Sequence, residues 1–134
     1  MKRAAMGALL VSALSGCISQ PAAPAHTLDL TGNVSSRLVL TRAAYVRVRL
    51  YEVVAGQPRM VAKSDYRVSA LPLGFSFHVP AATDRQWLIR SELAWSEAGS
   101  VQARGWRQVV PGQAAQLQLT PLTCYPNCRI HTPW

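Results

Sequence analysis

The stretch AYVRVRLYEVV, residues 44–54, decides the fold of this 134-residue chain. Its apolar side chains recur at every second position, at Val46, Val48 and Leu50. The positions between them carry large polar side chains, namely Tyr45, Arg47, Arg49 and Tyr51. Because successive side chains of an extended strand project to opposite faces, a period of two predicts a strand with one buried and one exposed face.

Segments on both sides of this stretch repeat the alternation. Clear patterns lie at residues 73–79 (LGFSFHV), 86–96 (QWLIRSELAWS) and 114–122 (AAQLQLTPL), and weaker ones at residues 27–34, 60–68 and 101–110. Gly and Pro residues separate these segments, and no long apolar pattern with helical spacing follows residue 17. About seven short strands joined by turns predict an all-β fold, an antiparallel β-sandwich.

The apolar rows of these strands predict the core. In residues 86–96 the row contains Trp87, Ile89, Leu93 and Trp95, with the hydroxyl of Ser91 among them. Trp106 and Trp134 are candidate interface anchors, although a tryptophan such as Trp106 is more often a core residue. A chain of this length, with 49% hydrophobic and 15% charged residues, suits one packed domain.

The N-terminus has the features of an export signal. Lys2 and Arg3 precede an apolar run at residues 4–14, which has the length of a signal-peptide core and is too short to span a bilayer. The quartet Leu14-Ser15-Gly16-Cys17 that follows resembles the bacterial lipobox. The alternative is a plain secretory signal that happens to contain a cysteine.

The lipobox resemblance implies that Cys17 becomes the first residue and carries a covalent lipid, with three acyl chains in all. One acyl chain binds membranes only marginally, whereas several bind stably. Ile18 follows the cysteine, and the Asp that retains many Gram-negative lipoproteins in the inner membrane is absent, which implies the outer membrane. We therefore expect a lipid anchor there, with the domain facing the periplasm.

The segment after Cys17 predicts a tether. Residues 18–27 (ISQPAAPAHT) contain two prolines and several small residues, a composition that favours an extended linker. The predicted organisation is a signal peptide at residues 1–16, a lipidated tether at residues 17–27 and a β-sandwich domain at residues 28–134.

The other two cysteines lie close together near the C-terminus. Cys124 and Cys128 enclose Tyr-Pro-Asn, and Pro and Asn favour turns. In an oxidising periplasm this spacing predicts a disulfide, which would contribute about 2 kcal/mol by the chain-entropy estimate. A metal site that uses both cysteines and His131 is the alternative, but no second Cys or His pair completes a ligand set.

The charge narrows the class of partner. The chain has a formal net charge of +8, and removal of Lys2 and Arg3 leaves about +6, carried almost entirely by arginine. Export makes nucleic acid an improbable partner. Anionic lipid headgroups and an acidic protein remain as candidate partners.

The sequence contains no constellation that predicts catalysis. His26, His78 and His131 are scattered, and the six acidic residues show no paired spacing. The nucleophile elbow and the glycine-rich phosphate loop are also absent. We expect no enzymatic activity, no metal and no cofactor other than the covalent lipid on Cys17.

Several of these patterns together resemble one family. They are Gly32-Asn33-Val34, the alternating strand 45–50, the segment LGFSFHVP at residues 73–80 and the strand Trp87-Leu-Ile-Arg-Ser91. With the lipobox, and over roughly residues 28–120, the sequence resembles the YscW-type lipoproteins, whose best-known members are pilotins of type III secretion systems.

The resemblance implies a carrier. A pilotin travels to the outer membrane by its lipid and escorts a secretin subunit, which it recognises by the C-terminal segment of the secretin. The family also contains envelope lipoproteins without a known secretion role. A general envelope lipoprotein or binding module is therefore the alternative function.

The exposed face of residues 44–54 is the candidate partner-binding surface. Tyr45, Arg47, Arg49 and Tyr51 would form a stripe of aromatic and arginine side chains, the types enriched in binding hot spots. The alternative is an ordinary solvated sheet face.

Overall fold

The computed structural model describes residues 27–80 and 85–129. The predicted signal peptide, Cys17 and the tether as far as residue 26 lie outside these residues, as do His131 and Trp134. The predictions made for them are therefore neither supported nor contradicted by the fold.

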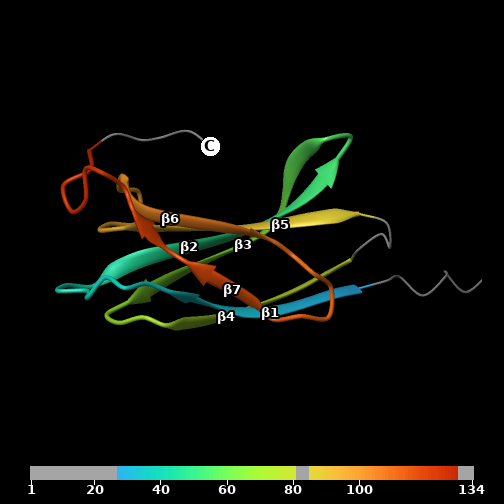
Figure 1. The fold of residues 1–134 in the computed structure, drawn as a ribbon, viewed down its shortest axis with the longest axis horizontal. Helices are drawn as coiled ribbons and strands as arrows, with labels where there is room; N and C mark the ends of the chain where they lie inside the picture. Colours follow the sequence, from blue (N-terminus) through green and yellow to red (C-terminus); the bar gives the residue numbers. More distant parts are fainter. Residues whose placement is uncertain (1–26, 81–84, 130–134) are drawn as a thin grey trace, which may run out of the picture.

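The described part consists of strands, turns and irregular connections, without a helix. Its eight strands are β1 (Thr27–Ser35), β2 (Ala44–Val54), β3 (Gln57–Val68), β4 (Leu73–Pro80), β5 (Gln86–Ala94), β6 (Val101–Gln108), β7 (Ala115–Gln118) and β8 (Thr120–Pro121). A three-stranded sheet has the order β4-β1-β7, and a five-stranded sheet has the order β3-β2-β5-β6-β8. Figure 1 shows the two sheets stacked as layers, which confirms the predicted all-β sandwich.

The alternation in β2 is realised as predicted. Val46, Val48 and Leu50 are fully buried, whereas the side chains between them are half-buried on the opposite face. The same inward rows on both sheets build one core, whose members include Leu28, Leu30, Val34, Phe75, Phe77, Val79, Trp87, Ile89, Leu93, Leu117 and Leu119. Each such side chain, taken out of water, contributes about 1.5–3 kcal/mol.

One strand pair departs from an antiparallel sandwich. β1 and β7 run parallel, with Gly32 opposite Ala115 and Val34 opposite Leu117. After β7 the chain crosses at Leu119 to the other sheet, where β8 pairs with β6. One continuous segment therefore belongs to both sheets and closes one side of the sandwich.

Two glycines allow this closure. A Cβ on Gly32 would lie 2.2 Å from the carbonyl oxygen of Ala115, and a Cβ on Gly105 would lie 2.3 Å from that of Gln118. Real Cβ atoms do not approach backbone so closely, so both contacts require a residue without a side chain.

The β2–β3 hairpin is the longest in the described chain, and its far end projects from the body of the sandwich (Figure 1). The register shifts between Leu50 and Tyr51, as in a β-bulge, and bulges increase the local bend and twist. At the tip, Ala55 and Gly56 both have a positive φ, which suits a tight two-residue turn.

Candidate functional site

The candidate site lies on the outer face of the five-stranded sheet, which we define as the side turned away from the core. β2 contributes Tyr45, Arg47, Arg49 and Tyr51 to this face, the four side chains predicted to form a stripe. Cross-strand register adds side chains from β3, β5 and β6, because directly paired residues project to the same side. Thus Arg47 lies between Asp65 and Glu92, and Arg49 lies between Lys63 and Arg90.

Arg47 is held by groups of its own chain. Its guanidinium donates to the Glu92 carboxylate at 3.2 Å and to the carbonyl oxygens of Glu97, at 2.6 Å, and Gly99, at 3.1 Å. The side chain is only 12% exposed. Arg47 therefore fastens the β5–β6 connection to β2.

Arg49 binds the same carboxylate from the neighbouring position. Its guanidinium donates to the second oxygen of Glu92 at 3.2 Å, and Glu92 is only 4% exposed. At the next row, the Arg90 guanidinium lies 5.1 Å from the ring centre of Tyr51, within the range of a cation–π contact. Three of the four predicted stripe residues are thus engaged within the sheet.

The outer face is nonetheless strongly cationic. Its basic side chains, placed by the register, are Arg47, Arg49, Lys63, Arg67, Arg90 and Arg104, and its acidic ones are Asp65 and Glu92. Six positive charges against two negative ones leave this face with a formal charge of +4. Such a surface attracts acidic partners and repels basic ones.

A groove opens at the β6 side of this face. Its volume is about 760 Å³, and its lining residues are Leu88, Arg90, Arg104, Gly105, Trp106, Gln118, Thr120, Pro121 and Leu122. A smaller hollow of about 190 Å³ adjoins it, lined by Val53, Gln86, Trp87, Leu88, Trp106 and Gln108. Trp106 and Leu88 are shared by both hollows. We refer to the larger one as the Trp106 groove.

Trp106 itself is 67% exposed, so of its two interpretations the structure excludes the core and places it at the surface. The alternation within β6 already contains the reason. Val101, Ala103 and Gly105 share the inward parity, whereas Trp106 shares the outward parity of Arg104 and pairs with Arg90.

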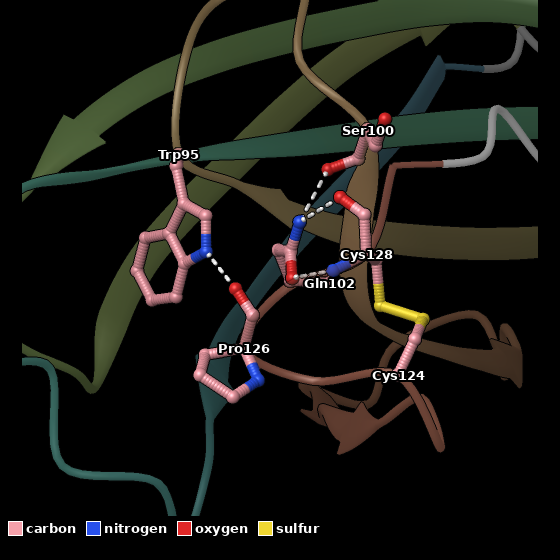
Figure 2. The surroundings of a disulfide bond; sticks show 6 residues. All are labelled: Trp95, Ser100, Gln102, Cys124, Pro126 and Cys128. Atoms are coloured by element: carbon pink, nitrogen blue, oxygen red, sulfur yellow. Dashed lines mark hydrogen bonds between the residues drawn. A yellow bond between two sulfur atoms is a disulfide. The ribbon is translucent and has the colours of Figure 1, made fainter.

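The C-terminal loop packs against the start of β6. Cys124 and Cys128 form a disulfide, with the sulfurs joined across a four-residue separation (Figure 2). The buried side-chain amide of Gln102 donates to the carbonyl oxygen of Cys128 at 2.9 Å and accepts from its backbone N–H at 3.0 Å. Trp95, just beyond β5, donates its indole N–H to the carbonyl oxygen of Pro126 at 2.9 Å.

Three further ionisable side chains, His78, Asp29 and Glu52, lie in side-chain pairs within the described residues. His78 is exposed and paired with Asp29 across β1 and β4. Glu52 is buried at the end of β2, where it pairs with Arg59 and Arg85. Residues 27–80 and 85–129 contain no group of three or more His, Cys, Asp or Glu that could hold a metal ion.

A further finding concerns helices that could span a membrane. Within the same two ranges, none is long and apolar enough to cross a bilayer.

Comparison with known proteins identifies relatives over almost the whole chain. A family described as type III secretion system lipoprotein chaperone (YscW) matches residues 25–120. A type 3 secretion system pilotin of Pseudomonas aeruginosa is 37% identical over 122 residues, which cover 90% of this chain and 89% of the relative. A pilotin of the same kind from Yersinia enterocolitica is 33% identical over 125 residues, covering 91% and 92%.

A solved structure shares the fold. It is an alternative pilotin from the type II secretion system of Vibrio cholerae, with a TM-score of 0.57 over 72% of this chain and 98% of that chain. The sequences are only 16% identical, so this likeness concerns the arrangement of strands alone.

Proposed function

The chain belongs to the YscW family of type III secretion system lipoprotein chaperones, and from that membership we propose that it is an outer-membrane pilotin. In this function it binds a secretin subunit, carries it to the outer membrane and promotes its assembly into a ring. The observation that carries the proposal is the match to two pilotins over about nine-tenths of the chain. The family is described as one of lipoprotein chaperones, and the proposed function includes no enzymatic activity.

The anchor in this proposal is a lipid on Cys17. The support is the order of charged segment, apolar run and Leu-Ser-Gly-Cys in the sequence, together with the lipoprotein character of the family. A protein tail bound to an anchored carrier shares the destination of the carrier without any membrane-inserting sequence of its own. Several acyl chains hold such a carrier at the membrane far more stably than a single one.

The cargo in this proposal is the C-terminal segment of the secretin. A charged face and an open groove suit a short segment better than a folded domain, because the nine residues that line the groove are few compared with the roughly 20–30 residues that each partner contributes to a standard protein interface. The excess of arginine on the outer face favours a segment with carboxylates.

Deletion of the gene tests the proposal. The secretin is expected to remain monomeric or to accumulate outside the outer membrane, measured by membrane fractionation and by the heat-resistant multimer on a gel. Normal secretin rings in the deletion strain would contradict it. Envelope sensitivity with normal rings would instead indicate a general envelope lipoprotein.

Replacement of the lipidated residue separates location from folding. The Cys17→Ser variant is expected to be folded and soluble in the periplasm, to bind the secretin there and to leave it mislocalised. Mass spectrometry of the native wild-type protein should show the acylated N-terminal cysteine. An unmodified N-terminus on a freely soluble wild-type protein would refute the anchor.

A further inference from the structure

Trp106 is the exposed aromatic anchor on this surface. The described residues with large, exposed apolar side chains are Val39, Met60, Trp106 and Val110, and Trp106 is the aromatic member of this set. Tryptophan is enriched at binding hot spots because one indole buries a large area at a small cost in conformational entropy. It lines two adjoining hollows, and a partner side chain in either of them would contact the indole.

The groove also has a definite charge. Arg90 and Arg104 line it, and no acidic side chain is among its lining residues. Leu88 and Pro121 supply apolar walls. The surroundings therefore favour a ligand that combines an apolar side chain with carboxylates.

The main-chain hydrogen-bonding groups of Trp106 do not pair with β5. Val109 donates its N–H to the carbonyl oxygen of Trp87, so the alternating antiparallel pattern aims the N–H and C=O of Trp106 away from β5. β8 pairs only with Ala103 and Arg104, and its ladder stops before Trp106. The main-chain groups of Trp106 therefore point to the side of β6 on which Gln118 and β8 lie.

We propose that the Trp106 groove is the docking site for the C-terminal segment of the secretin. The segment places an apolar side chain against Trp106 and Leu88 and carboxylates beside Arg90 and Arg104. This inference rests on the proposed pilotin function and assigns its binding step to the β6 edge. It moves that step away from the predicted stripe on β2, where Arg47 and Arg49 are fastened to Glu92.

Binding of a labelled peptide tests the apolar half of the site. The probe is a fluorescein-labelled peptide covering the C-terminal tail of the secretin from the same secretion system, titrated with the purified soluble Cys17→Ser protein. Trp106→Ala should weaken binding about 30-fold, the size of a hot-spot loss. Met60→Ala is the matched control, because Met60 is an exposed apolar side chain outside the groove, and it should change the affinity less than about threefold.

Charge reversal tests the cationic half. Arg104→Glu should weaken binding at least about tenfold, whereas Arg67→Glu, the same change at the far β3 edge, should have an effect below about threefold after correction to equal ionic strength. Replacement of every Asp and Glu of the peptide by Asn and Gln should weaken its binding to the unaltered groove. The Arg104→Glu variant and its parent should then bind this neutral peptide with equal affinity.

The outcomes distinguish the groove from the function. If the peptide binds and Trp106→Ala and Arg104→Glu bind it as tightly as their parent, the docking site is wrong and the pilotin function stands. If the peptide does not bind and secretin rings form without this protein, the pilotin function itself is wrong. Circular dichroism spectra that match the parent would show that both exposed substitutions leave the sandwich folded.

Discussion

At the scale of single residues, Ser91 is a polar side chain buried among apolar ones. It is fully buried in the middle of β5, and its hydroxyl has no hydrogen-bond partner among the described residues. The sequence already placed Ser91 within an apolar row. Burial of an unpaired hydroxyl costs about 1–3 kcal/mol, so this position lowers the stability of the fold.

We therefore predict that Ser91→Ala stabilises the protein by about 1 kcal/mol, since the lost hydroxyl leaves only a small gap. Urea unfolding of the soluble domain, followed by tryptophan fluorescence, measures the change. Ser76→Ala, on the exposed side of β4, is the control and should lie within about 0.5 kcal/mol of the parent. A loss of stability in Ser91→Ala would mean that the hydroxyl has a partner, such as a buried water molecule.

Glu92 is the reverse case, a buried charge with several partners. It accepts from Arg47 and Arg49 at 3.2 Å each, and its side chain is only 5% exposed. Removal of one member of such a buried group leaves the other charges without compensation.

Glu92→Gln should consequently destabilise the fold by about 3 kcal/mol. The same urea titration provides the measurement. Glu97→Gln changes an exposed carboxylate on the adjacent turn while retaining the backbone carbonyl that Arg47 uses, so its effect should be below about 0.5 kcal/mol. Equal stability of Glu92→Gln and the parent would show that the arginines are adequately solvated without the carboxylate.

At the scale of elements, the alternation of apolar and polar residues was sufficient to predict most of the strands. It places β2, β4, β5 and β7 within a few residues of their observed bounds and assigns their inward rows correctly, because a strand that buries one face leaves a period of two in the sequence. β3 carries a weak pattern for a physical reason. Its side chains are half-buried or exposed, so burial imposes little order on its residues.

The sequence pattern did not predict which strands pair with each other. The parallel contact of β1 with β7 and the crossing of the chain to β8 depend on close backbone approach at Gly32 and Gly105. A single glycine within a strand pattern indicates such an approach but does not identify the other backbone. The hydrogen bonds of the Arg47 guanidinium could not be predicted from the sequence either, because their acceptors lie on a turn about fifty residues further along the chain.

The closure at Gly105 yields a prediction for an element. Gly105→Ala should destabilise the sandwich by more than about 2 kcal/mol, since its Cβ would overlap the backbone of Gln118 and force β7 and β8 away from β6. Gly74→Ala is the matched control. It lies in a strand, has no positive φ and meets nothing within 4 Å, so it should be neutral or slightly stabilising.

Thermal unfolding of both variants, with hydrogen exchange of the β6–β8 amides, separates these expectations. Fast exchange confined to β6, β7 and β8 in Gly105→Ala would locate the damage at the crossing. Equal melting temperatures of Gly105→Ala and Gly74→Ala would contradict the tight contact.

At the scale of the whole molecule, the proposed anchor and the proposed groove are separate parts of one polypeptide. β1, which follows the predicted tether, begins at one end of the long axis, and the disulfide loop lies at the other (Figure 1). The groove lies on the β6 edge between them and uses no residue of β1. Loss of either part should therefore leave the other intact.

This separation leads to a prediction about cells that express two variants of the protein, each of which lacks one of the two parts. Cys17→Ser should bind the secretin tail but fail to carry it, and Trp106→Ala should reach the outer membrane but arrive without cargo. Expressed together in the deletion strain, the two variants should still leave the secretin mislocalised, because escort requires the lipid and the groove on the same chain. The double variant Cys17→Ser/Trp106→Ala, paired with one wild-type copy, is the control and should assemble normal rings. Restoration of rings by the two single variants would show that one copy can anchor the cargo held by another, as in a dimer of pilotins.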